Sequence, residues 1–153
     1  MVGLRHKIKD DRLGFFALAV FSFLFSISAC TPSIPEKYRS MSISELVKCL
    51  QSKEGTVRAN AIVVLGTRGK DAIPAIPDLI KVLGDNRQYV RNCAMDALAE
   101  IGKASVPALV EAVEKDKNKV VRFHAAGALR KIHTKESQAA YEAYFKREGY
   151  KYA

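Results

Sequence analysis

Apolar residues recur at steps of three and four positions in three separate stretches of the chain. Such spacing places them on one face of a helix and predicts three amphipathic helices. The second stretch begins at Val90, which lies 33 residues after Val57 (90 minus 57) and 31 residues before Val121 (121 minus 90). A unit that recurs at this period predicts a solenoid, in which each unit buries its apolar face by stacking on its neighbours. The stripe consists of Val57, Ala61 and Leu65, then Val90, Ala94, Leu98 and Ile101, and finally Val121, Ala125, Leu129 and Ile132.

Shorter apolar segments lie next to these helices, at residues 43–50, 76–83 and 106–113. Pro77 and Pro107 stand near the starts of the second and third segments, where a helix tolerates a missing N–H. Each unit is therefore expected to be two antiparallel helices joined by a polar turn. The predicted fold class is all-α, an α-solenoid of three short helix pairs.

A last helix is expected at residues 137–147, where Tyr141, Tyr144 and Phe145 share one face. A solenoid needs a terminal element that covers the exposed face of its last unit. The aromatic rings predict that this helix is such a cap, and a ligand-binding aromatic patch is the alternative.

The units share a short motif: Val-Arg, two small residues, Ala-Leu and Ile-Gly, followed by Ile-Pro or Val-Pro before a Leu-rich helix. This pattern resembles the HEAT-repeat family, and in particular the short HEAT-like repeats of phycobilisome lyases, over roughly residues 43–133. The third copy departs from the pattern, because Lys131 and His133 stand where Gly would be usual. The resemblance implies a module for protein–protein interaction or scaffolding.

The resemblance also implies which residues meet a partner. In such solenoids the second helix of each unit lines a concave surface, and positions that project from those helices are candidates for partner binding. A solvated helix face is the alternative for most of them. The candidates are Asn60, Val63, Asn92, Asp96, Phe123, Gly127 and Lys131.

Three arginines occupy the same position in the three units, and a functional interpretation would make them a phosphate-binding row. We interpret Arg58, Arg91 and Arg122 as structural instead. Asp85 stands six residues before Arg91, and Asp116 stands six residues before Arg122. HEAT repeats carry an Asp–Arg ladder at this spacing, and planar guanidinium donors suit a carboxylate. The first unit has Ser52 in place of the acid, so its arginine, Arg58, is expected to be the least coupled.

The N-terminal segment has the composition of a secretory signal. Basic residues between Arg5 and Arg12 precede an uncharged apolar run at residues 13–29. Ile27-Ser28-Ala29-Cys30 then resembles the lipobox of bacterial lipoproteins. That resemblance implies cleavage between Ala29 and Cys30 and acylation of Cys30, for instance with palmitate. Ordinary signal cleavage and an uncleaved N-terminal helix are the alternatives.

The expected organisation follows from these boundaries. Residues 1–29 are a signal peptide that is removed, residues 30–42 are a lipid anchor with an extended tether, and residues 43–153 are the repeat domain with its capping helix and a short tail. The lipid on Cys30 would attach the protein to a membrane, facing the periplasm or cell exterior. Thr31 rather than Asp follows this cysteine, which favours the outer membrane in a Gram-negative cell.

The charge balance is strongly basic, and the basic excess remains after the signal is removed. Four of the 25 Lys and Arg and two of the 16 Asp and Glu lie in residues 1–29, which leaves 21 basic and 14 acidic residues and a net charge of +7. Export disfavours nucleic acid as the partner. The basic surface would suit anionic lipids, acidic envelope polymers or an acidic partner protein, and a merely solvated surface is the alternative because the charges are scattered. A protein partner is expected, and the repeat domain is expected to be monomeric.

The sequence contains no recognisable catalytic motif, so we expect neither catalysis, a cofactor nor a metal. His124 and His133 are nine residues apart and lack a bracketing carboxylate motif. Cys49 and Cys93 fall on predicted helices without zinc spacing, which predicts buried thiols, with a disulfide as the alternative. The rival function is enzyme-like: phycobilisome lyases attach or detach a bilin on a client cysteine. Those proteins work inside the cell, and three repeats offer little surface for a large chromophore.

Overall fold

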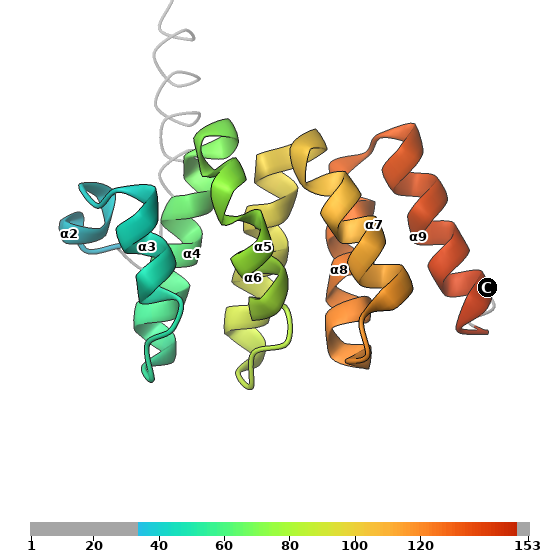
Figure 1. Ribbon diagram of the computed structural model, residues 1–153, viewed down its shortest axis with the longest axis horizontal. Coiled ribbons are helices and arrows are strands. Elements are labelled where there is room, and N and C mark those ends of the chain that lie inside the picture. The colour runs from blue at the N-terminus through green and yellow to red at the C-terminus, as the bar shows by residue number, and fades with distance from the viewer. Residues whose placement is uncertain (1–33, 150–153) are drawn as a thin grey trace, which may run out of the picture. The chain divides into compact units, whose positions relative to one another are not determined.

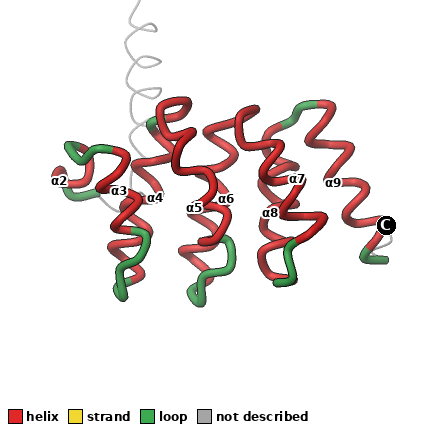
Figure 2. Tube along the Cα trace, viewed as in Figure 1, coloured by secondary structure: helices red, strands yellow, loops and turns green. Residues whose placement is uncertain are grey.

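The computed structural model describes residues 34–149, and all of the regular elements in this range are helices joined by short loops (Figures 1 and 2). The predicted signal peptide, with its cleavage site at Ala29 and Cys30, lies outside the described residues, as do residues 150–153. The elements are α2 (Glu36–Arg39), α3 (Ile43–Cys49), α4 (Gly55–Thr67), η2 (Gly69–Ala75), α5 (Ile76–Val82), α6 (Gln88–Ile101), η3 (Gly102–Ser105), α7 (Val106–Lys115), α8 (Lys119–Ile132) and α9 (Lys135–Arg147).

Three helix pairs, α3 with α4, α5 with α6 and α7 with α8, follow one another along a single row (Figure 1). Each of these six helices places one leucine with 0 % exposure in a continuous core, so every pair contributes equally to the stack. The six leucines are Leu46, Leu65, Leu79, Leu98, Leu109 and Leu129. The predicted all-α solenoid of three helix pairs is confirmed.

Each unit leaves its second helix through one residue with positive φ. Gly69 follows α4 with φ 52°, Gly102 follows α6 with φ 77°, and His133 follows α8 with φ 57°. In the first two units a 3₁₀ turn then leads into the next helix, with Pro77 or Pro107 at its start. Gly102 has ψ −136°, a conformation that glycine adopts readily, whereas His133 is left-handed with ψ 27°, so the third unit leaves its helix through a strained residue.

The N-terminal end of the repeats differs from the predicted tether. Residues 36–39 form α2, and Tyr38 is only 3 % exposed in the core. Arg68 at the end of α4 donates from Nη2 to the backbone oxygens of Arg39 and Met41, both at 2.8 Å. The prediction of an extended tether is therefore wrong for residues 34–42, because Tyr38 supplies enough buried surface to dock this segment as an N-terminal cap.

The C-terminal helix α9 packs beside α7 and α8 at the other end of the row (Figure 1). A capping box of Thr134 and Ser137 starts it. Tyr144 is 4 % exposed, and Arg147 donates to the backbone oxygen of Val113 at 2.7 Å. The expected packing of aromatic residues against the third unit is present. None of the described helices has the length and apolar character that crossing a membrane requires.

Candidate interaction surface

The second helices α4, α6 and α8 approach one another more closely than the first helices do. A Cβ atom added at Gly66 in α4 would lie 3.0 Å from Cα of Ala97 in α6, so only glycine allows this approach. We call the surface formed by α4, α6 and α8 the second-helix face. Close packing along one row of helices is what curves a solenoid toward that row.

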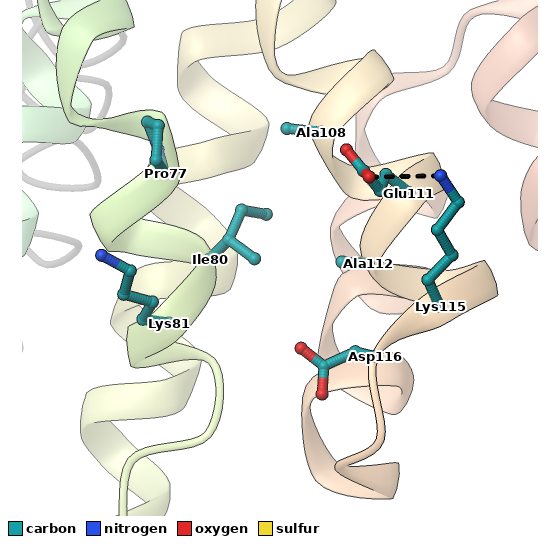
Figure 3. Close-up of a pocket in the computed structure, with 8 residues that line it drawn as sticks. All are labelled: Pro77, Ile80, Lys81, Ala108, Glu111, Ala112, Lys115 and Asp116. Carbon is teal, nitrogen blue, oxygen red and sulfur yellow. Dashed lines mark hydrogen bonds and ion pairs between the residues drawn. The ribbon is translucent and has the colours of Figure 1, made fainter.

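The first helices leave a groove on the opposite side of the stack. A hollow of ≈ 420 Å³ separates α5 from α7. Figure 3 shows Ile80 of α5 pointing toward α7, where Lys115 pairs with Glu111 at 3.3 Å. Ala108 and Ala112 form the α7 side of this groove. Its wall is apolar and its rim is charged, but α5 is only seven residues long and the α7 side consists of small alanines, so the groove has little relief for recognition.

Two adjoining hollows lie on the second-helix face, and we call them the central hollows. One, of ≈ 160 Å³, lies between α4 and α6, and the other, of ≈ 360 Å³, lies between α6 and α8. They share Asp96 and Glu100, so the depression crosses α6 and has two acidic side chains at its middle. The first is lined by Val63, Gly66, Cys93, Asp96, Ala97 and Glu100, and the second by Asp96, Ala99, Glu100 and Lys131.

Three of the seven predicted partner-binding residues meet in the central hollows. Val63 lines the first, and Lys131 forms an ion pair with Asp96 across the second. The side chains of Lys131 and Asp96 are 42 % and 52 % exposed. An exposed pair of this kind contributes only about 0–1 kcal/mol to stability, which leaves both charges available to a partner.

The other four predicted residues are spread along the same helices. Phe123 is 51 % exposed at the N-terminal end of α8. Asn92 is exposed, whereas Asn60 is half-buried. Gly127 is half-buried opposite Met95, whose Sδ would lie 2.7 Å from an added Cβ. These residues do not gather into one cluster with the central hollows.

The sequence interpretation included Asp96 but missed Glu100, the second acid at the centre of this surface. Glu100 lies one helical turn after Asp96, so a search for partners at the next turn of the same helix would have found it. Cys93 lies in the same hollow, one turn before Ala97. Burial and the negative charge of Asp96 raise the pKa of the Cys93 thiol. Cys93 and Cys49 are half-buried free thiols rather than fully buried ones.

The predicted arginine ladder exists, but its hydrogen bonds differ from the prediction. The Nη1 atoms of Arg58, Arg91 and Arg122 donate to a backbone carbonyl six residues earlier, at Ser52, Asp85 and Asp116 respectively. The distances are 2.7, 2.8 and 3.1 Å. The spacing of six thus reflects contact with the turn backbone. The predicted pairing of Arg91 with the Asp85 carboxylate and of Arg122 with the Asp116 carboxylate is wrong, because each arginine bonds the backbone oxygen of that residue instead.

Carboxylates instead meet the arginine of the preceding unit. Arg58 holds Asp85 through Nε at 2.7 Å and Nη2 at 2.8 Å. Arg122 contacts Glu148, beyond α9, at 3.4 Å. Burial acts to raise the pKa of Asp85, but hydrogen bonds from Arg58 and from the Arg87 N–H outweigh it and lower the pKa below its ordinary value. Arg58, expected to be the least coupled arginine, therefore makes the most complete ion pair.

Arg91 is the exception among the three. Within residues 34–149 no ion pair joins it to Asp116, which is the counterpart of Asp85 in the next unit. The Asp116 carboxylate accepts from the Asn118 N–H at 2.8 Å and lies at the edge of the α5–α7 groove (Figure 3). The Nε of Arg91 is buried and finds no acceptor in the described part of the chain.

No group of three His, Cys, Asp or Glu side chains comes together as a metal site within the described range. His124 was a candidate for a catalytic or metal-binding role. Its Nδ1 forms a hydrogen bond with the backbone oxygen of Val120 at 2.8 Å. His133 serves as the left-handed residue after α8. The second helices therefore offer hollows, charges and exposed aromatic rings at Tyr89 and Phe123, which are the components of a binding site.

Stacked helix pairs with capped ends define an α-solenoid repeat protein. The family model for HEAT repeats matches residues 43–130 and again residues 76–148, so the two matches together cover most of the chain. The protein belongs to the HEAT-repeat family. The second match extends through α9, so the part of the chain that matches the family is longer than residues 43–133, which the motif predicted. Comparison with curated proteins finds no match.

Proposed function

We propose that this protein is an exported, lipid-anchored HEAT-repeat module that binds a protein partner through its second-helix face. The observation that carries the proposal is the pair of central hollows, where Asp96, Glu100 and Lys131 present exposed charges on closely packed helices. Rigid helices hold these groups in fixed positions, which lowers the entropy lost on binding. No cofactor is needed for such a role.

The anchoring part of the proposal rests on the sequence around Cys30. Three residues separate this cysteine from Ile34, where the docked N-terminal segment begins. Four Cα-to-Cα steps span at most about 14 Å. The repeats would therefore be held close to the membrane surface in the cell envelope, in the outer membrane where the cell has one.

The anchor is tested by labelling cells with radioactive palmitate. Cys30→Ser should abolish labelling and leave a larger precursor, because the acylated sulfur and the processing site are both lost. Equal labelling of the wild type and the variant would rule out the lipid anchor without affecting the binding proposal.

The binding face is tested by crosslinked pull-down from intact envelopes, with captured proteins identified by mass spectrometry. Asp96→Lys and Lys131→Asp should each reduce recovery of the specific partner about tenfold or more, as expected when a charge at an interface is reversed. Lys81→Glu on α5 is the matched control, because its side chain is 73 % exposed on the opposite side of the stack.

The charge-swapped double variant separates binding from folding. If Asp96 and Lys131 only pair with each other and stabilise the fold, exchanging the two residues restores the ion pair and with it the recovery of the partner. If they contact a partner, the exchange presents the wrong charges and recovery stays low. Restored recovery of the partner in the charge-swapped variant would therefore contradict the assignment of binding to the second-helix face. Binding to acidic polymers, the alternative source of affinity, would instead strengthen in Asp96→Lys.

A further inference from the structure

A third hollow, of ≈ 280 Å³, lies at the other end of the second-helix face, and we call it the Arg91 hollow. It brings together side chains from α6, α8 and α9. Its lining combines two basic residues with two exposed apolar ones, a composition that differs from that of the central hollows. The lining residues are Arg91, Lys119, Val120, Phe123, His124, Tyr144 and Glu148.

Arg91 enters this hollow with an unsatisfied donor. Its Nη1 is held by the backbone oxygen of Asp85 at 2.8 Å, which fixes the plane of the guanidinium. Its Nε is buried and has no acceptor among residues 34–149. At the equivalent position of the first unit, Nε of Arg58 donates to Asp85 at 2.7 Å. Because Nε has no accessible surface, a carboxylate in the hollow would meet the guanidinium at Nη2, for which no hydrogen bond is present among the described residues.

The charges around the hollow favour a single negative group. Glu148 is the carboxylate in the lining, and it already pairs with Arg122 at 3.4 Å and with Arg147 at 3.7 Å. Arg91 and Lys119 therefore lack a compensating acid in the lining. A carboxylate would be attracted by both cations, and its single charge would meet less repulsion from Glu148 than a phosphate dianion would.

The apolar side of the hollow is exposed and held in place. Val120 is 40 % exposed and Phe123 is 51 % exposed. The Phe123 ring packs edge-on against His124, with ring centroids 5.5 Å apart. His124 is in turn fixed by its bond to the backbone of Val120. An exposed aromatic ring that is already ordered loses little entropy on contact with a ligand.

We propose that the Arg91 hollow binds an acidic segment of a partner protein, with a carboxylate on Arg91 and a neighbouring apolar side chain against Phe123 and Val120. The inference rests on the proposed function in assuming a protein partner, and it adds the chemistry of that partner at a separate place on the face. Asp85 on Arg58 shows within this protein that the corresponding arginine pairs with a carboxylate, there through Nε and Nη2.

The test measures fluorescence anisotropy of a labelled peptide, Gly-Ser-Glu-Phe-Glu-Leu-Gly-Ser, titrated with the full chain in mild detergent. The wild type should bind it, and the same peptide with Gln in place of Glu should bind at least about tenfold more weakly. Arg91→Gln should weaken binding about 10- to 100-fold, the range expected for losing hydrogen bonds to a charged group. Arg91→Lys should recover only part of the loss, because a flexible ammonium lacks the planar guanidinium that the Asp85 carbonyl holds in place.

Two further variants keep the result independent of folding. Arg87→Gln removes the same charge from an exposed side chain near the start of α6 and should leave peptide affinity within about twofold of the wild type. Phe123→Ala, at an exposed position, should weaken binding severalfold with an unchanged melting temperature. Equal losses in Arg87→Gln and Arg91→Gln would contradict the proposal.

Two further measurements distinguish an acidic peptide from phosphate and from a lipid headgroup as the ligand of Arg91. Inorganic phosphate should compete weakly, and vesicles containing phosphatidylglycerol should bind independently of Arg91. Tight phosphate or vesicle binding that is lost in Arg91→Gln would overturn the assignment to an acidic peptide. Absence of peptide binding, with partner capture still dependent on Asp96 and Lys131, would overturn this inference alone. Failure of both measurements would remove the proposed function itself.

Discussion

Arg58 and Asp85 join two neighbouring units of the solenoid through two parallel hydrogen bonds, of 2.7 Å from Nε and 2.8 Å from Nη2. Their side chains are only 10 % and 9 % exposed. Arg58 also donates to the backbone oxygen of Ser52 at 2.7 Å, so a single guanidinium connects the turn of its own unit with the turn of the next. Solenoid units contact only their neighbours, which makes such a connection important for the stability of the stack.

Arg58→Ala should therefore be the most destabilising of the three ladder substitutions. We expect a loss of about 1.5–3 kcal/mol in the free energy of unfolding, the range for hydrogen bonds to charged groups. Arg91→Ala, which removes a bond to one carbonyl, should cost about 1 kcal/mol. Urea denaturation measures both. A double-mutant cycle of Arg58→Ala with Asp85→Ala should give a coupling of about 0.5–3 kcal/mol, and a coupling near zero would contradict the role assigned to the pair.

Asp85 should also make stability depend on pH in the acidic range. Its pKa is lowered in the folded state, so it binds a proton more weakly there than in the unfolded chain. Its contribution is complete above the unfolded pKa of about 3.9 and is lost as the pH falls through the lower, folded value. Wild type and Asp85→Asn should therefore differ in unfolding free energy by a constant amount from roughly pH 5 to 7. Below about pH 4 this difference should shrink. A difference that persists undiminished at acidic pH would point to an effect of shape rather than charge.

Gly66 should tolerate substitution less well than Gly127. A side chain at Gly66 meets the backbone of α6 at 3.0 Å, and a packed helix yields only by separating from its neighbour. Gly66→Val should cost about 1–3 kcal/mol. At Gly127 the obstacle is the flexible end of Met95, so Gly127→Ala should change stability by less than about 1 kcal/mol, helped by the better helix propensity of alanine. Thermal unfolding measures both variants. If Gly66→Val destabilised the protein no more than Gly127→Ala, the close approach of α4 and α6 would be unimportant for stability.

His133→Gly should stabilise the protein. His133 has φ 57° after α8, where a left-handed residue other than glycine costs roughly 1–2 kcal/mol. Part of this gain is offset by the greater freedom of glycine in the unfolded chain, which leaves a net gain of about 0.5–1 kcal/mol. Gly102→Ala is the opposite control, because φ 77° and ψ −136° lie in a region restricted to glycine, and it should destabilise by about 1–3 kcal/mol. Denaturation of both variants that gave the same sign would refute this account of the turn.

Asp96→Asn should speed the alkylation of Cys93. Burial first, and then the charge of Asp96, raises the pKa of the Cys93 thiol and reduces the fraction of reactive thiolate. Removing the charge should raise the iodoacetamide rate at about pH 7.5, because the pKa of the thiol falls and a larger fraction of it is ionised. Cys49 in α3 is the internal reference, and its rate should stay constant. A rate at Cys93 that fell in Asp96→Asn would show that the carboxylate does not act through charge.

Repetition made most of the fold predictable from the sequence. The offsets of 33 and 31 residues align the apolar stripes, and the same offsets relate Gly69, Gly102 and His133, which share positive φ. The docking of residues 34–42 was not predictable in this way, because α2 occurs once and depends on Tyr38 finding a place in the core. Two prolines nearby favoured an extended segment, and packing overrode that local preference.

The hydrogen bonding of the ladder shows what spacing leaves undetermined. A separation of six residues correctly brings Arg91 to Asp85, yet it does not distinguish the backbone oxygen from the carboxylate. Whether an acid reaches the arginine of the previous unit depends on how units stack, which a single copy does not encode. Glu148 pairs with Arg122 although it lies beyond the recognisable motif. For the surface, the helical repeat located Asp96 and Lys131, while the Arg91 hollow required three helices to be placed together.

The docking of α2 has a mechanical consequence. A force applied to the chain at residue 34 does not act on α3 first, because Arg68 ties the α2–α3 segment to the end of α4 by two bonds of 2.8 Å. Tyr38 must leave the core before α3 can peel away. Since each unit is supported only by its neighbours, a solenoid pulled from one end unravels from that end. The short helix α2 must therefore undock before a force from the N-terminal side can separate α3 from the stack.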